Sequence, residues 1–283
     1  MTSPKMFAQS SLIAAACTAL ALLASSLPSL ASDTSLSPAA RCDRAAGSVY
    51  DTTRNTAFDP VETEEIVIGV ALSACREAYR HERSPRITFQ LARALHRAGD
   101  TGKAMVLLEE AAQAGHALAM VNYGVLISER GHASEAVALY RTAAEAGNVL
   151  ALYNLGVAYR DGAGVSADGA EARRWFERAA AAGDEIAAFN IGAMLDEGVQ
   201  LGENDVEAAR YYRVAVDGGS IDAMINLALM LEHGEGVARD IPAALDLYRK
   251  AAERGDEQAR ARYEALTTPV PAETAEAGTA AIN

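Results

Sequence analysis

Apolar residues between positions 86 and 256 recur three or four residues apart, in two segments per period. Such spacing predicts amphipathic helices. The first segment of a period places a small residue where a neighbouring helix can come close, as at Gly156, and the second carries a large pair such as Trp175 and Phe176. Large side chains opposite small ones are what antiparallel helices need in order to pack. The pattern therefore predicts helical hairpins, which must stack because one hairpin cannot bury both of its apolar faces.

Each period closes on a glycine that follows the second helix. A glycine can take the left-handed backbone conformation that ends a helix. The next residue is a strong helix N-cap in four of the five copies, so one helix ends and the next begins within two residues. The glycines, spaced by 32 residues once and then by 36, are Gly115, Gly147, Gly183, Gly219 and Gly255.

The four extra residues of the longer period fall in the turn between the two helices of a hairpin. Residues 129–132 form the short turn, and the longer pattern occupies 161–168 and returns at 232–240. We expect a valine in each long loop to pin that loop onto the core. We also expect the closing aspartate, Asp168 or Asp240, to lie near the start of the second helix.

The recurring positions make up a long motif that resembles the Sel1-like repeat, a relative of the tetratricopeptide repeat. The copy at 221–256 matches well, whereas the copy at 185–220 departs in its loop, and the shorter units at 85–148 are closer to ordinary tetratricopeptide repeats. The most complete copy has Ala151, Asn154, Leu155, Gly156, Tyr159, Gly162, Gly164, Val165, Asp168, Ala172, Trp175, Ala179, Ala180 and Gly183.

The resemblance implies an all-α fold, in which antiparallel helix pairs form a right-handed superhelical solenoid. Residues 86–256 would hold five repeats, and residues 257–266 would form a capping helix that begins a further unit and then stops. The tail at 267–283 contains two prolines and many small residues without apolar periodicity, so we expect it to be disordered.

Residues 1–31 have the pattern of a secretory signal peptide. Lys5 precedes an apolar core from Leu12 to Leu23, and small residues stand at the two positions that define cleavage, Ser29 and Ala31. The alternative is an uncleaved membrane anchor, but a span needs about 20 apolar residues and Pro28 lies just beyond a shorter run. We expect a periplasmic or secreted protein, with no membrane span after cleavage.

Signal cleavage would leave two cysteines, Cys42 and Cys75, in the segment 32–85 that precedes the repeats. An even pair in an exported chain predicts a disulfide, which would close a loop of about 34 residues and contribute about 3–4 kcal/mol. The alternative is two unrelated thiols. The segment resembles the cysteine-bearing region before such repeats in some exported bacterial proteins, which implies a disulfide-tied helical cap over the apolar end of the solenoid.

Charge and residue types narrow the possible functions. The formal net charge of −13 opposes binding to nucleic acid, which needs a basic face, and it permits basic partners. None of the five histidines has the spacing of a metal-ligand pair, and adjacent acids such as Glu109 and Glu110 point in different directions on a helix. We therefore expect no metal site, no cofactor and no catalytic residues.

In helix-pair solenoids of the resembled family, the first helix of each repeat lines the inner curve. That implies an apolar strip with a ladder of amides, able to hydrogen-bond an extended backbone, and an acidic margin at Asp161, Glu197 and Glu232. Alternatively, the asparagines satisfy buried carbonyls between repeats and the aromatic residues belong to the core. The candidate partner-binding residues are Asn122, Tyr153, Asn154, Phe189, Asn190, Ile225 and Asn226.

These features favour a non-enzymatic adaptor or regulator of the bacterial cell envelope, which binds a partner protein or an extended peptide on the concave face. One alternative is a cell-wall-related hydrolase or antibiotic-binding protein, but related proteins of that kind carry a cysteine pair in nearly every repeat, and this chain has no cysteine after Cys75. Another is a purely structural spacer. The identity of the partner, the pathway and the oligomeric state are not encoded in these patterns.

Overall fold

The computed structural model describes residues 35–198 and 200–268, and these residues contain helices and no strands. They divide into two compact units, unit 1 up to Trp175 and unit 2 from Phe176 onward. The division falls inside helix α8 (Gly169–Ala181). The all-α helical repeat fold expected from the sequence is therefore confirmed, and each unit is described separately.

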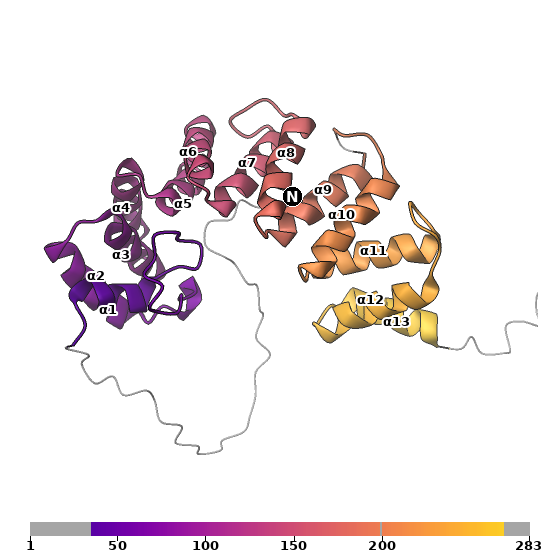
Figure 1. Ribbon diagram of the computed structural model, residues 1–283, viewed down its shortest axis with the longest axis horizontal. Coiled ribbons are helices and arrows are strands. Elements are labelled where there is room, and N and C mark those ends of the chain that lie inside the picture. The colour runs from indigo at the N-terminus through magenta and orange to yellow at the C-terminus, as the bar shows by residue number, and fades with distance from the viewer. Residues whose placement is uncertain (1–34, 199, 269–283) are drawn as a thin grey trace, which may run out of the picture. The chain divides into compact units, whose positions relative to one another are not determined.

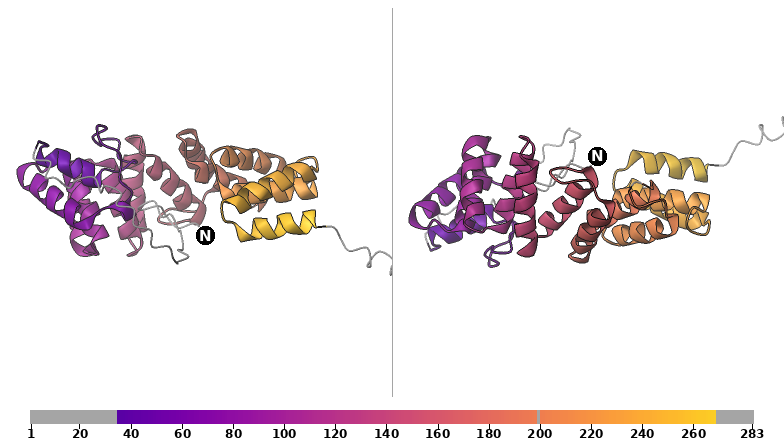
Figure 2. Two further views of the ribbon diagram at one scale, coloured as in Figure 1. Left: turned by 90° about the horizontal axis from the view of Figure 1, so that it is seen from below. Right: turned by 90° about the horizontal axis from the view of Figure 1, so that it is seen from above.

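Unit 1 begins with a helical cap, followed by hairpins in which consecutive helices pack on each other (Figure 1; Figure 2). The cap consists of α1 (Pro38–Ala46), the 3₁₀ turn η1 (Thr63–Glu65) and α2 (Ile68–His81). The hairpin helices are α3 (Pro85–Arg97), α4 (Thr101–Gln113), α5 (Ala117–Ser128), α6 (Ala133–Glu145) and α7 (Val149–Asp161), and the unit ends in the first part of α8.

Unit 2 continues the pattern to a single last helix, which begins at Glu257 and ends at Thr267. No helix within the described ranges of either unit is long and apolar enough to cross a bilayer. The expected signal peptide and C-terminal tail lie outside the described residues. The helices of unit 2 after α8 are α9 (Glu185–Asp196), α10 (Asp205–Asp217), α11 (Ile221–His233), α12 (Ile241–Glu253) and α13 (Glu257–Thr267).

The recurring glycines end the second helices as expected, since all five have φ between 81° and 98°. The residue after each glycine caps the next helix: Asn148 Oδ1, for example, accepts from the Ala151 amide at 3.1 Å. The first copy along the chain carries His116 at this position, and it also acts as a cap, because its Nδ1 accepts from the Ala119 amide at 3.1 Å. The divergent loop of the fourth repeat keeps its cap as well, with Asn204 in place of the aspartate.

Close approach of the two helices in a hairpin depends on one small residue. A Cβ at Gly124 would lie 2.6 Å from the Tyr140 ring, and a Cβ at Gly192 would lie 2.7 Å from the Tyr212 ring. At the same repeat position α13 carries Glu264, whose side chain is too large for such an approach. The small residue that lets the two helices of a hairpin come close is therefore not kept in α13.

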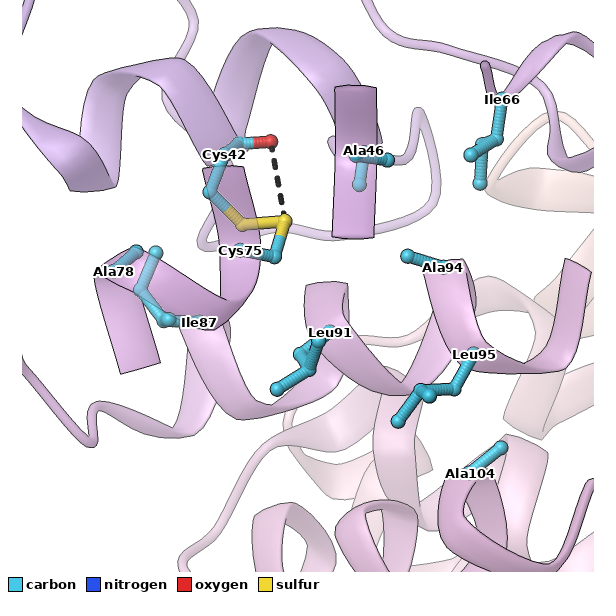
Figure 3. Close-up of a cluster of buried hydrophobic side chains, with 11 residues drawn as sticks. Cys42, Ala46, Ile66, Cys75, Ala78, Ile87, Leu91, Ala94, Leu95 and Ala104 are labelled. Atoms are coloured by element: carbon cyan, nitrogen blue, oxygen red, sulfur yellow. Dashed lines mark hydrogen bonds between the residues drawn. A yellow bond between two sulfur atoms is a disulfide. The ribbon is translucent and has the colours of Figure 1, made fainter. Parts of the chain in front are cut away.

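The cap is joined internally by a disulfide between Cys42 of α1 and Cys75 of α2, the pairing expected from the cysteine count, with Cα atoms 4.6 Å apart. The bond is buried and belongs to a cluster that includes Ile87 and Leu91 of α3 (Figure 3). The dashed line from Cys75 Sγ to the Cys42 carbonyl, at 3.9 Å, marks a van der Waals contact, because a disulfide sulfur carries no proton. The disulfide thus lies in the core shared by the cap and the first repeat helix.

Residues 47–67, here called the strap, connect α1 to α2 and lie against three successive first helices. The side chain of Arg93 on α3 is buried and donates to the carbonyls of Ala46 and Val61 and to the Thr63 hydroxyl. Further along, Asp51 lies 3.3 Å from His116 at the start of α5. Asn148 at the start of α7 donates to the Tyr50 carbonyl. The strap is therefore held by polar contacts from α3, α5 and α7.

Candidate functional site

The recurring amide connects neighbouring repeats in unit 2. Asn226 Nδ2 on α11 donates to the Tyr212 hydroxyl on α10 at 3.1 Å, and that hydroxyl donates to Asp196 Oδ2 on α9 at 3.0 Å. One repeat earlier the facing residue is Phe176, which has no hydroxyl, and Asn190 Nδ2 donates instead to the Ile186 carbonyl of its own helix. These bonds favour the packing role for Asn190 and Asn226.

The next copy replaces the amide with Arg262, and the same inter-repeat link becomes an ion pair. Arg262 donates through Nε and Nη2 to Glu232, and the Tyr248 hydroxyl donates to Glu232 Oε2 at 3.1 Å. Hydrogen bonds from Arg262 lower the pKa of the Glu232 carboxyl. Glu232 is only 6% exposed, so its placement on an open acidic margin was wrong. The sequence contained a signal for this packing role, because Arg262 stands at the repeat position where Asn190 and Asn226 carry the amide.

This ion pair leads to a prediction. Arg262→Met leaves Glu232 charged and buried with Tyr248 as its remaining donor, so the free energy of unfolding at pH 7 should fall by about 1–3 kcal/mol. Because the Glu232 pKa is lower in the folded state, the stabilisation is present above the unfolded pKa of about 4.3 and is lost as the pH falls through the folded pKa. Urea unfolding followed by circular dichroism at pH 7 and pH 3 measures both effects.

The matched control for that experiment is Arg260→Met on the same helix. Arg260 pairs with Glu257 on the exposed face of α13, where ion pairs contribute little. The control should lie within about 0.5 kcal/mol of wild type at pH 7. An equal loss in both variants, or a loss in Arg262→Met that persists at pH 3, would contradict the assigned role of the buried pair.

Four of the seven candidate partner-binding residues are buried: Asn122, Tyr153 and Asn154 are each 1% exposed and Asn190 is 3% exposed. The Oδ1 atom of Asn122 has no hydrogen-bond partner among the described residues. The other three, Phe189, Ile225 and Asn226, are half-buried and lie in unit 2. The structure therefore does not present the amides as one exposed ladder.

Unit 2 keeps an apolar face on its first helices. Phe189 and Ile225 occupy the same repeat position on α9 and α11, and Leu229, one turn after Ile225, is 38% exposed. Sequence reasoning missed Leu229, although its i+4 spacing from Ile225 places it on the same side of the helix. Two exposed carboxylates, Glu197 directly after α9 and Asp222 in the first turn of α11, make no ion pair among the described residues. Together these five residues define the unit 2 face.

The acidic charge of the chain is concentrated in unit 2. Residues 176–268 include 18 acidic and nine basic side chains, whereas residues 35–175 include 17 acidic and 15 basic ones. A surface surrounded by one sign of charge raises the rate and selectivity of association with oppositely charged partners. Unit 2 therefore has a formal net charge of −9 over its described residues, against −2 for unit 1.

One histidine is buried beside a carboxylate and a hydroxyl, as catalytic residues can be. His116 Nε2 lies 3.3 Å from both Asp51 Oδ1 and Thr53 Oγ1, while Nδ1 accepts from the Ala119 amide. A catalytic relay needs the carboxylate on one ring nitrogen and the hydroxyl on the other. Here both oxygens face the same nitrogen, so the arrangement anchors the strap. No cluster of potential metal ligands occurs within residues 35–198 and 200–268.

Comparison with known proteins gives a family for the repeats. A model of the Sel1 repeat matches five consecutive segments, and it includes the two shorter units that the sequence patterns placed closer to ordinary tetratricopeptide repeats. No curated protein sequence matches the chain. The matched segments are residues 92–116, 117–148, 149–184, 186–220 and 221–256.

Solved structures agree with this assignment. A Sel1 repeat protein from Oxalobacter formigenes is 28% identical with a TM-score of 0.55, over 62% of this chain and 73% of that protein. A protective antigen of uropathogenic Escherichia coli strains, described as having an SLR fold, is 24% identical with a TM-score of 0.55, over 70% of this chain. The match spans about half of the E. coli protein, 48% of its length. This second likeness shows the fold alone.

Proposed function

Because the chain belongs to the Sel1 repeat family, whose members are generally protein–protein interaction scaffolds, we propose that it is a non-enzymatic adaptor that holds a partner protein in the bacterial cell envelope. The observation that carries the proposal is the unit 2 face, where Phe189, Ile225 and Leu229 are left partly exposed beside unpaired carboxylates. Apolar anchors within a polar surround are typical of protein-binding surfaces. The Cys42–Cys75 disulfide supports an oxidising compartment.

We propose further that the partner docks a basic segment with apolar side chains on this face. The excess of acidic residues in unit 2 supports a basic partner, and the apolar strip supports one that also buries hydrophobic side chains. The two contributions differ in their response to salt. Raising the salt concentration weakens the electrostatic part and leaves the apolar part largely unchanged.

Capture of partners from an envelope extract tests the adaptor role. Immobilised wild-type chain should retain a partner that the double variant Ile225→Glu with Leu229→Glu loses at least tenfold, as measured by quantitative mass spectrometry. Val206→Glu is the matched control, because Val206 is 62% exposed on the second helix α10, and it should retain the partner. Failure of the wild type to retain any protein, or equal retention by the double variant, would refute the proposal.

A further inference from the structure

A pocket of about 530 Å³ opens beneath the disulfide-bonded helix in unit 1. Leu91 and Leu95 of α3 form part of its lining and are almost fully buried. Val106 and Leu107 of α4 supply further apolar lining. Val106 is 63% exposed, so its side chain is open to solvent as well as lining the pocket.

The second helices of the repeats start in register, so α4 can be compared position by position with the four helices that follow it. At the position of Lys103 they carry Glu or Ala, and at the position of Val106 they carry Ala, Arg or Asp. Helix α4 therefore has a cation where the others have an acid or alanine, and an exposed valine where three of the four have a charge. In chain order the equivalents are Glu135, Glu171, Glu207 and Ala243 for Lys103, and Ala138, Arg174, Arg210 and Asp246 for Val106.

The charged groups around the pocket leave it with an excess of positive charge. Lys103 Nζ lies 2.5 Å from Asp100 Oδ2. Arg76 of α2, the residue after Cys75, also lines the pocket and makes no ion pair among the described residues. Two cations thus face one carboxylate, in a chain whose formal net charge is −13. A positive rim above an apolar floor is complementary to an amphiphile with an anionic head.

We propose that this pocket binds a small amphiphile, with an apolar chain against Leu91, Leu95 and Val106 and a carboxylate head group between Arg76 and Lys103. The departure of α4 from the other repeats is the argument for a ligand, because none of the other second helices combines a cation and a valine at these two positions. A lysine in the first turn is unfavourable with respect to the helix dipole, and the other repeats avoid it. Burial of the chain should raise the affinity about fourfold for each added methylene until the pocket is full.

The test is calorimetric titration of the full chain with dodecanoate below its micelle concentration. Dodecyltrimethylammonium, which has the same chain and the opposite charge, is the comparison ligand. We expect dodecanoate to bind at least tenfold more tightly than the cationic amphiphile. Absence of dodecanoate binding, or equal affinity for the two amphiphiles, would overturn the proposal.

Two variants give α4 a residue that other second helices carry at the same position, so we expect both variants to fold. Lys103→Glu places a glutamate three residues after the N-cap Asp100, which is a favourable capping arrangement. Its melting midpoint should therefore equal or exceed that of wild type while its affinity for dodecanoate falls at least tenfold. Val106→Asp should lose affinity to a similar degree.

The control is Val206→Asp on α10, an exposed valine away from the pocket, which should bind dodecanoate as wild type does. Wild-type affinity in Lys103→Glu and Val106→Asp would show that the ligand binds elsewhere. The proposal would then be refuted whatever the fold stability.

Discussion

Arg93→Ala is expected to lower the free energy of unfolding by about 3–5 kcal/mol, because two buried carbonyls and a hydroxyl lose their charged hydrogen-bond donor. The Arg93 side chain is 2% exposed; it donates to the strap at the Val61 carbonyl and the Thr63 hydroxyl, and to the Ala46 carbonyl at the end of α1. Burial lowers the Arg93 pKa to about 10, so the guanidinium is still protonated at neutral pH. Its removal leaves the carbonyls of Ala46 and Val61 without these donors and opens a cavity beside α3.

The measurement is urea unfolding followed by circular dichroism, with the disulfide kept oxidised in every sample. Arg97→Ala is the matched control, because Arg97 lies one turn further along α3, is exposed, and donates to one carbonyl of the strap, that of Glu64. The control should lose about 0.5–1 kcal/mol. If both variants lose the same amount, Arg93 does not hold the strap as described.

The position of the strap, and the burial of Arg93 beneath it, could not be predicted from the sequence. The repeat helices can be predicted because their apolar residues recur periodically along the chain. Stacking can be predicted because each hairpin has apolar faces that must be buried. The strap has no period, and its anchors join residues far apart in the chain, such as Asp51 with His116 and Tyr50 with Asn148. Nothing local in the sequence specifies such pairs.

The candidate site could be predicted only in part, because a repeat pattern shows which residues recur but not what they do. The asparagine row was visible as a repeat, but a recurring residue is equally compatible with binding and with packing. Comparison in register would have separated the two roles, since Arg262 replaces the amide where Glu232 replaces Asp196. Those residues change together because they are linked across the repeat boundary, Arg262 to Glu232 directly and Asn226 to Asp196 through the Tyr212 hydroxyl. The exposure of Leu229, by contrast, depends on which faces the neighbouring helices cover.

Gly236→Ala is expected to have an effect of similar size, by steric overlap with the preceding repeat. Gly236 lies in the turn between α11 and α12 with φ +63°, and a Cβ there would lie 2.3 Å from the backbone carbon of Asp205, the first residue of α10. Gly164 has the same relation to Ala133 at the start of α6, so the contact recurs in unit 1. The long turn thus packs on the second helix of the repeat before it, and only a glycine fits.

The expected loss for Gly236→Ala is about 2–5 kcal/mol, of which about 1–2 kcal/mol comes from the left-handed backbone and about 1–3 kcal/mol from the overlap. Gly255→Ala separates the two, because Gly255 has φ +98° and nothing within 4 Å of an added Cβ. It should lose only the backbone contribution of about 1–2 kcal/mol. Urea unfolding of both variants gives the difference. If Gly236→Ala is no less stable than Gly255→Ala, the turn does not clamp neighbouring repeats together, and the extra four residues of the longer repeat need another explanation.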